Sequence, residues 1–386
     1  MRSSKIAILG TRGIPACYGG FETFVEEIGP RLVNSGFDVS VYGRKGVIKY
    51  HDQFYKGCRI ILLPAIYHKY LETITHTFLS FLHIVIFNKV DLILLCNAAN
   101  SPFAWIARIF GIPVIINVDG IERKRAKWNI FGRIWYYFGE LSSVLFASKI
   151  VADAEVIYDY YRRTYRADSE IIAYGYRETD QSLIDQKLSG IDLKLDFLSN
   201  LKLKNNSYIL YVSRLEPENN AHLVIDAYNQ LVNDGIIFPE ELPLVIVGDA
   251  PYSSDYILDL KRRAGDGVRF LGYVFGEGYL NLQLGAKIYI QATEVGGTHP
   301  ALVESMGFAN CVIAHKTAEN IEVLGDCGYY FEYRSVQSLV EILGHLVLDS
   351  QKINESRRSA FLRAKQCYSW DKVTNDYIKL FENHLK

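Results

Sequence analysis

The chain has 386 residues, of which 49% are hydrophobic and 10 are proline, so it is too long for one ordinary domain and too apolar to be disordered. Its 42 basic and 43 acidic side chains nearly cancel, which argues against the broad positive field of a nucleic-acid-binding protein. The six cysteines are scattered and form no CxxC pair, a pattern that favours reduced thiols in the cytosol over disulfides or a zinc site.

Short β-branched runs alternate with amphipathic stretches through the first half of the chain. They predict strands at 5–9, 39–42, 59–63, 91–95, 114–116 and 149–152, with helices over 21–34 and 130–146. Such alternation is typical of a parallel sheet that is covered on both faces. The amino-terminal apolar run is too short for a secretory signal, so we expect a cytoplasmic protein.

The most hydrophobic segment is residues 78–87. It is shorter than the roughly 20 apolar residues that a bilayer span requires. A buried helix is therefore expected, and a helix that dips into a membrane is the alternative.

The pattern is interrupted at 178–206, which is rich in Asp, Lys, Ser and Asn, and then resumes. Further strands are predicted at 208–212, 244–247, 268–270, 287–290 and 311–314, followed by a long helical stretch over 351–386. We therefore expect two Rossmann-like, doubly wound α/β domains at 1–177 and 207–365, joined by a linker at 178–206, with a C-terminal helix at 366–386 that can cross back to the first domain. Ligands of such sheets bind at the carboxyl ends of the strands, so two facing domains predict a cleft between them.

A glycine-rich turn follows the first predicted strand and leads into a helix. Gly13, Gly19 and Gly20 lie in this turn, where glycine allows a ligand close to the backbone and a helix amino terminus favours an anion. The spacing differs from GxGxxG, which argues against a dehydrogenase. An ordinary tight turn is the alternative interpretation.

A second turn gives the stronger signal. It follows the strand at 287–290, and its residues are Gly296, Gly297, Thr298 and His299. Pro300 suits the first position of a helix, with Thr298 or His299 as its cap. Free backbone amides here predict a diphosphate site, and Glu304, one turn along the helix, is placed to accept a hydrogen bond from a sugar or ribose hydroxyl.

Several motifs together carry a resemblance to a known family. They are Gly13-Ile14-Pro15-Ala16, Tyr18-Gly19-Gly20-Phe21-Glu22-Thr23, Asp119-Gly120, Arg125-Ala126-Lys127-Trp128, Ala173-Tyr174-Gly175, Arg214 with Pro217-Glu218-Asn219-Asn220, and Glu294-Val295-Gly296-Gly297-Thr298. In these residues the chain resembles the large family of retaining glycosyltransferases with the GT-B fold, of family four type, and within it a capsule-type branch of β-1,4-rhamnosyltransferases.

The resemblance implies roles for residues that spacing alone does not assign. Arg214 would grip the donor diphosphate, with Asn219 near the place where the wider family has a lysine. Glu294 lies two residues before the position at which the family usually has a glutamate that holds the donor sugar. Asp119 and Glu122 are the polar candidates for orienting the donor sugar or the attacking hydroxyl.

No metal or other cofactor is expected, because the sequence has no Asp-x-Asp triplet and no histidine–carboxylate cluster. The resemblance implies a nucleotide-diphosphate sugar as the co-substrate. With retention of anomeric configuration implied and no evident protein nucleophile, we expect front-face transfer assisted by the departing phosphate.

A basic and aromatic segment on the first domain predicts the acceptor side. Its residues are Arg123, Lys124, Arg125, Lys127 and Trp128. Such a segment suits an anionic bilayer or a polyprenyl diphosphate head group, so the protein is expected to lie at the cytoplasmic face of the inner membrane. A solvated helix start is the alternative.

The resemblance makes the donor dTDP-L-rhamnose and the acceptor a lipid-linked saccharide for capsule, exopolysaccharide or O-antigen. Transfer of another hexose from a UDP or GDP donor is an alternative within the same class. A nucleotide-sugar epimerase and a non-catalytic saccharide-binding protein are alternatives of other classes.

Overall fold

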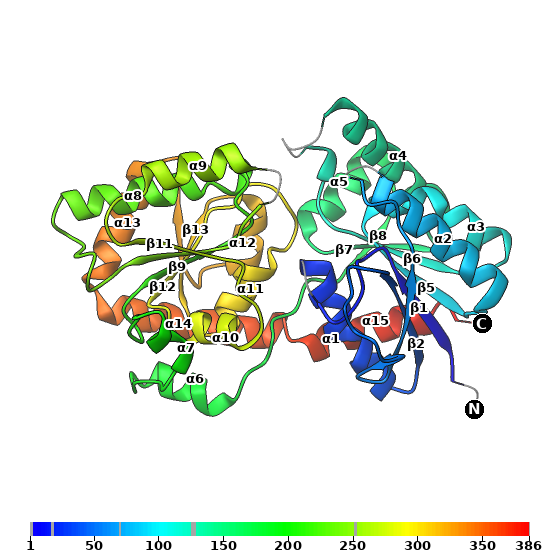
Figure 1. The fold of residues 1–386 in the computed structure, drawn as a ribbon, viewed down its shortest axis with the longest axis horizontal. Coiled ribbons are helices and arrows are strands. Elements are labelled where there is room, and N and C mark those ends of the chain that lie inside the picture. Colours follow the sequence, from blue (N-terminus) through cyan, green and yellow to red (C-terminus); the bar gives the residue numbers. More distant parts are fainter. Residues whose placement is uncertain (1–2, 17–18, 69–70, 125–128, 251–252, 386) are drawn as a thin grey trace. The chain divides into compact units, whose positions relative to one another are not determined.

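The chain divides into two compact units (Figure 1). The computed structural model describes residues 3–16, 19–68, 71–124, 129–250 and 253–385. Met1–Gly175 and Trp370–Lys386 form the first unit, and Tyr176–Ser369 forms the second. Each unit has a mainly parallel sheet with helices between its strands, so the expected α/β fold class is confirmed.

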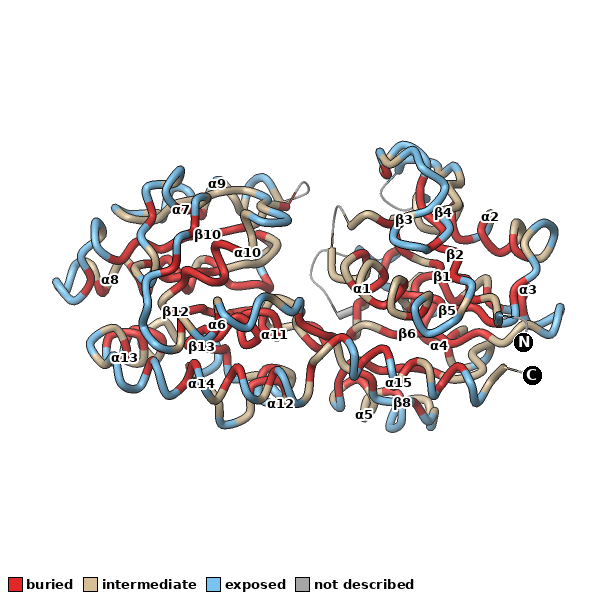
Figure 2. Tube along the Cα trace, turned by 90° about the horizontal axis from the view of Figure 1, so that it is seen from below, coloured by how far each residue is buried: buried red, intermediate tan, exposed pale blue. Residues whose placement is uncertain are grey.

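The first unit has an eight-stranded sheet in the order β3-β4-β2-β1-β5-β6-β7-β8. Its neighbouring strands are parallel, except that β3 pairs antiparallel with β4. The strands are β1 (Lys5–Leu9), β2 (Asp38–Arg44), β3 (Phe54–Tyr55), β4 (Cys58–Leu63), β5 (Leu92–Cys96), β6 (Val114–Val118), β7 (Lys149–Ala152) and β8 (Ser169–Ile171). Figure 2 shows how buried residues concentrate in these strands.

Helices of the first unit separate into two layers, each with its own apolar core. One core contains α1 (Gly20–Asn34) and α15 (Trp370–Glu382). The other contains α2 (Leu71–Phe87), α3 (Ala104–Ile109), α4 (Ile130–Phe146) and α5 (Glu155–Tyr165). Two short 3-10 helices, η1 (Ala98–Phe103) and η2 (Glu122–Lys124), follow β5 and β6.

The second unit has a fully parallel six-stranded sheet in the order β11-β10-β9-β12-β13-β14. Its strands are β9 (Ile209–Val212), β10 (Leu244–Val247), β11 (Val268–Gly272), β12 (Ile288–Gln291), β13 (Cys311–His315) and β14 (Tyr329–Phe331). Its helices are α6 (Gln181–Leu188), α7 (Asp196–Asn200), η3 (Pro217–Asn219), α8 (Ala221–Asn233), α9 (Ser254–Arg263), α10 (Gly276–Gly285), α11 (Pro300–Gly307), α12 (Ala318–Leu324), α13 (Val336–Val347) and α14 (Ser350–Cys367).

Residues 178–206, expected as a linker, contain α6 and α7 and belong to the second unit. Lys187 on α6 is 5% exposed, and its ammonium donates to Phe308 O at 3.0 Å and Asn310 Oδ1 at 2.7 Å. These buried bonds hold the segment against the unit. The polar composition that suggested a linker reflects the outer faces of two short helices.

Two helical expectations need correction. The segment 78–87 is the second half of α2, and it is buried along one side only, since Phe78 is 40% and Phe87 75% exposed. The stretch 351–386 is interrupted after α14. In agreement with the expected C-terminal helix that crosses back, α15 belongs to the first unit, where Trp370 packs against Phe24 and Tyr174.

Both sheets have a point at which the strand order reverses. In the first sheet it lies between β1 and β5, and in the second between β9 and β12. Loops that leave two such strands diverge to opposite faces, so a crevice opens at the carboxyl ends. Both glycine-rich turns identified in the sequence lie at these points.

Candidate functional site

The loops after β9 and β12 are joined at the switch point of the second sheet. The two strands are parallel neighbours, with Ile209 opposite Ile288. Asn220 donates its side-chain amide to Ala292 O at 2.9 Å, and Glu294 N donates to Glu218 O at 3.1 Å. The residues predicted to bind a donor therefore lie on two loops that are fixed to each other.

Arg214 lies two residues after the end of β9 and is partly buried. Its guanidinium forms no hydrogen bond or ion pair with the residues that the structure describes, so its permanent charge is available to an anion. Asn219, also predicted to bind the donor, is 3% exposed and donates its amide to Arg214 O at 2.7 Å. Asn219 thus shapes the loop that presents Arg214.

The turn before α11 is compact and buried. Gly296, Gly297 and Thr298 are buried, and a Cβ at Gly296 would come within 2.6 Å of the His299 ring. His299 is the N-cap residue, and Pro300 is the first residue of α11, as the sequence predicted. A side chain at position 296 would therefore require the His299 ring to move.

Glu304 lies on the buried side of α11 and is 8% exposed. The Tyr279 hydroxyl donates to Glu304 Oε2 at 2.7 Å and accepts from Gln283 Nε2 at 2.8 Å. Burial, with the nearby charge of Glu304, holds the pKa of Tyr279 well above its usual value. Tyr279 therefore remains a proton donor that orients one oxygen of this carboxylate.

Glu294 is held by an arginine that no sequence motif marks. Arg334 Nε and Nη2 donate to its two carboxylate oxygens at 2.6 and 2.8 Å, and Asn220 Nδ2 donates at 2.9 Å. Burial acts to raise the pKa of Glu294, but the hydrogen bonds from Arg334 and Asn220 lower it below its usual value. Glu294 is therefore an ionised, doubly anchored carboxylate.

In the first unit, the turn after β1 is held by carboxylates of α1. Arg12 N donates to Glu22 Oε1 at 2.8 Å and Ala16 N donates to Glu26 Oε2 at 2.6 Å. Gly13 has φ +106°, and a Cβ there would lie 2.7 Å from Gly43 Cα, so this position requires glycine.

The helix that follows this turn starts at the two other predicted glycines. Gly19 is the N-cap residue of α1, and Gly20 is its first residue. Thr23 N donates to Gly19 O at 3.2 Å. These glycines build the turn from β1 into α1 at the switch point of the first sheet.

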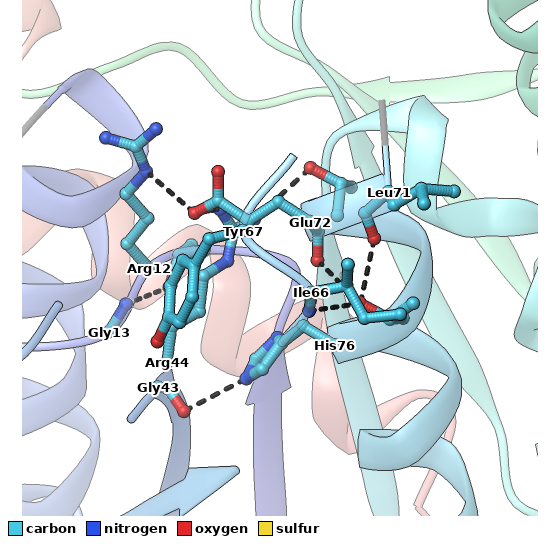
Figure 3. A network of polar contacts seen from close by, with 12 residues as sticks. Arg12, Gly13, Gly43, Arg44, Ile66, Tyr67, Leu71, Glu72 and His76 are labelled. Atoms are coloured by element: carbon cyan, nitrogen blue, oxygen red, sulfur yellow. Dashed lines mark hydrogen bonds and ion pairs between the residues drawn. The ribbon is translucent and has the colours of Figure 1, made fainter. Parts of the chain in front are cut away.

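A cluster of charged residues beside this turn was missed by the sequence interpretation (Figure 3). Glu72 accepts from Arg44 Nη1 at 2.6 Å and lies 3.8 Å from Arg12 Nε. His76 is 1% exposed, contacts Gly43 O at 3.0 Å, and has its pKa lowered to about 4, chiefly by burial. Glu72 and His76 lie on α2, Arg44 ends β2 and Arg12 lies in the turn after β1, so no single linear motif marked the cluster.

The predicted polar residues after β6 lie at the carboxyl edge of the first sheet. Asp119 follows β6 and is partly buried, and Glu122 begins η2 and is 9% exposed. Their predicted role in orienting the donor sugar or the attacking hydroxyl stays a prediction.

The basic segment predicted from the sequence begins with an arginine that is already paired. Arg123 donates from Nε to both oxygens of Glu140 at 3.1 Å and from Nη2 to the Tyr160 hydroxyl at 2.5 Å, so its charge is internally paired. Lys124 ends η2. The remaining predicted residues, Arg125, Lys127 and Trp128, lie outside the described residues.

In the part of the chain that the structure describes, no group of three or more His, Cys, Asp or Glu side chains is suited to a metal ion. Over the same residues, no helix combines the length and apolarity needed to cross a bilayer.

Comparisons with known proteins agree with this geometry. Residues 195–363 match the family Glycosyl transferases group 1, and residues 86–177 match the family Domain of unknown function (DUF1972). The O-antigen chain mannosyltransferase B of Escherichia coli is 26% identical over 191 residues, covering 49% of each protein. The match thus spans about half the length of this curated relative.

Among solved structures, sucrose-phosphate synthase of Thermosynechococcus elongatus has a TM-score of 0.80 at 17% identity, covering 98% of both chains. The HepE protein of Anabaena, in complex with UDP and glucose, has a TM-score of 0.76 at 16% identity, covering 99% of this chain and 100% of that one. At these identities the likeness concerns the fold. Residues 195–363 of the second unit thus match the family Glycosyl transferases group 1, and the two parallel-sheet units have the GT-B fold of these solved structures.

Proposed function

We propose that this protein is a glycosyltransferase that transfers a hexose from a nucleotide-diphosphate sugar to a saccharide acceptor. The observation that carries the proposal is the switch point of the second sheet. There a guanidinium without a partner among the described residues follows β9, and a buried glycine turn with an oriented glutamate follows β12. Arginine and backbone amides bind diphosphates, and a fixed carboxylate binds sugar hydroxyls.

For the donor we propose dTDP-L-rhamnose, on the strength of the motifs that resemble the rhamnosyltransferase branch. A GDP-mannose donor is the second candidate, because the relative in Escherichia coli is named a mannosyltransferase. A contact between Glu304 and the donor sugar ring or ribose would not distinguish dTDP-L-rhamnose from GDP-mannose. Deoxythymidine has only the 3′-hydroxyl to offer this carboxylate, and a ribonucleoside offers two.

We propose a lipid-linked saccharide as the acceptor, in the synthesis of capsule, exopolysaccharide or O-antigen at the cytoplasmic face of the inner membrane. Support comes from the same resemblance and from the O-antigen relative.

For the chemistry we propose retention of anomeric configuration by front-face transfer without a bound metal. Arg214 and the amides of the turn before α11 would stabilise the departing diphosphate, whose oxygen takes the acceptor proton. A covalent glycosyl-enzyme trapped in mass spectrometry would refute this mechanism.

The test is transfer by the purified protein to a short-chain, water-soluble glucosyl-diphospholipid, read by mass spectrometry with dTDP-rhamnose, GDP-mannose, UDP-glucose and UDP-galactose. Glu304→Ala and Arg214→Ala should abolish the product, and Glu355→Ala, an exposed glutamate of α14, should leave it unchanged. A deoxyhexose added only from dTDP-rhamnose supports the first candidate.

Other outcomes separate the alternatives. A hexose from GDP-mannose would favour the second candidate. Consumption of a nucleotide sugar without any acceptor would point to an epimerase, and binding without turnover, unchanged in both variants, would refute a transferase.

A further inference from the structure

Large apolar side chains are exposed on the helical layer of α2, α3 and α4. The three helices pack on the same face of the first sheet, and α3 contacts both of the others (Figure 1). We call their solvent-facing side the α2–α4 face. Six of its side chains are between 62% and 75% exposed: Phe87, Ile109, Phe110, Ile130, Phe131 and Leu145.

Helix α4 has an inverted distribution of residues. Its buried positions are Gly132, Gly139, Glu140 and Ser143, and a Cβ at Gly139 would lie 2.4 Å from Ala98 O. Small residues thus bring the helix close to η1, while the large apolar side chains of Ile134, Phe138 and Leu145, like those of Ile130 and Phe131, are exposed. A helix at a water-exposed surface normally shows the reverse, whereas small residues inside and large apolar residues outside are typical of helices in contact with lipid.

The charges on these helices give the face one sign. Glu72 and Glu140 are turned inward and paired with Arg44 and Arg123. Of the charged residues on α2, α3 and α4, Arg108 and Arg133 are exposed. The face is therefore apolar and cationic.

The α2–α4 face also exposes a tryptophan and a tyrosine, since Trp105 and Tyr137 are 45% and 48% exposed. Tryptophan, tyrosine and arginine are the side chains that favour the boundary between lipid and water. A second copy of the chain on this face would bring like charges together, whereas anionic lipid complements them.

We propose that the α2–α4 face rests on an anionic lipid bilayer, with the side chains of Ile130, Phe131 and Phe138 inserted at the level of the head groups. The proposal rests on the proposed function, because a lipid-linked acceptor lies in such a bilayer. It assigns the contact to a helical face rather than to the basic segment predicted from the sequence, whose Arg123 is paired internally. Helix α4 begins after β6, so this face reaches the carboxyl edge of the sheet.

The test is co-sedimentation of the full chain with phosphatidylcholine vesicles that contain or lack phosphatidylglycerol. We expect binding to the anionic vesicles, lowered at least about tenfold by the double substitution Phe131→Ser and Phe138→Ser. Arg133→Gln should lower it about fivefold and leave any binding to neutral vesicles unchanged. The control is Phe238→Ser with Leu348→Ser, two side chains of the second unit that are 58% and 77% exposed, and it should bind like the native protein.

Failure to bind anionic vesicles, or equal binding by the Phe131→Ser/Phe138→Ser variant, would overturn the proposal. A dimer in sedimentation velocity that the same two substitutions dissociate would assign the face to a second copy instead. Transfer to the water-soluble acceptor is measured on the same variants and should persist. Loss of vesicle binding with intact transfer supports the assignment, and vesicle binding without transfer would contradict only the proposed function.

Discussion

Removing one hydroxyl tests whether the orientation of Glu304 matters for transfer. Tyr279→Phe deletes the donor that lies 2.7 Å from Glu304 Oε2 and keeps the ring. A hydrogen bond to a charged group contributes about 1.5–3 kcal/mol, and each 1.36 kcal/mol corresponds to about tenfold in rate. If the bond is needed to present Glu304 to the donor, kcat/KM falls by about 10- to 150-fold.

The assay is steady-state transfer with the donor that supports turnover, at a temperature where circular dichroism shows both proteins folded. Tyr228→Phe is the matched control, since its buried hydroxyl donates to Leu242 O at 3.1 Å in the same unit but lies away from α11. It should lose about 1 kcal/mol of stability and little activity. Equal losses in the two variants, or full activity of Tyr279→Phe, would refute the role given to Tyr279.

Three further predictions concern stability. Burial lowers the pKa of His76 from 6.5 to about 4, so on acidification the unfolded chain binds a proton before the folded protein does. About 3 kcal/mol of stability is therefore lost as pH falls from 6.5 towards 4. In urea denaturation at several pH values, His76→Gln should show a weaker dependence of stability on pH. The lowered pKa of Glu294 means that its pair with Arg334 stabilises the fold above pH 4.5 and is lost below it. Arg334→Met should therefore cost about 1 kcal/mol at neutral pH and little in acid, and an equal cost at both pH values would contradict the pairing. Trp370→Ala, at a fully buried ring, should cost about 3–5 kcal/mol in chemical denaturation, and a loss below about 1 kcal/mol would exclude its place in the first unit's core.

Much of the fold was predictable because it rests on local patterns. The strands β1, β7 and β10 and the helix α4 have the predicted bounds, since each is a short β-branched run or an amphipathic stretch with a clear start. The short edge strands β3 and β8 were missed. Their two or three residues carry no periodicity, and only pairing with a neighbour defines them.

The candidate site was predictable where one loop contains it. Gly296 and His299 follow a strand and precede a helix, and local rules for turns and caps place them. Tyr279 and Arg334 reach Glu304 and Glu294 from separate elements, and nothing in their own neighbourhoods marks them.

Sequence patterns also did not predict which residues of α4 face the core. Its amphipathic pattern predicted a helix correctly but did not indicate which side of the helix faces the core. The small residues Gly139 and Ser143 are among its most buried positions.

The return of α15 to the first unit has a consequence for the order of folding during synthesis. The first unit's core contains Trp370, Tyr377 and Phe381, which are translated after the whole of the second unit. Tyr176 N donates to Tyr368 O at 2.9 Å, so the end of α14 is secured next to the beginning of the second unit. The half of the protein that leaves the ribosome first is therefore completed last, and until then its sheet presents the apolar surface that α15 will cover.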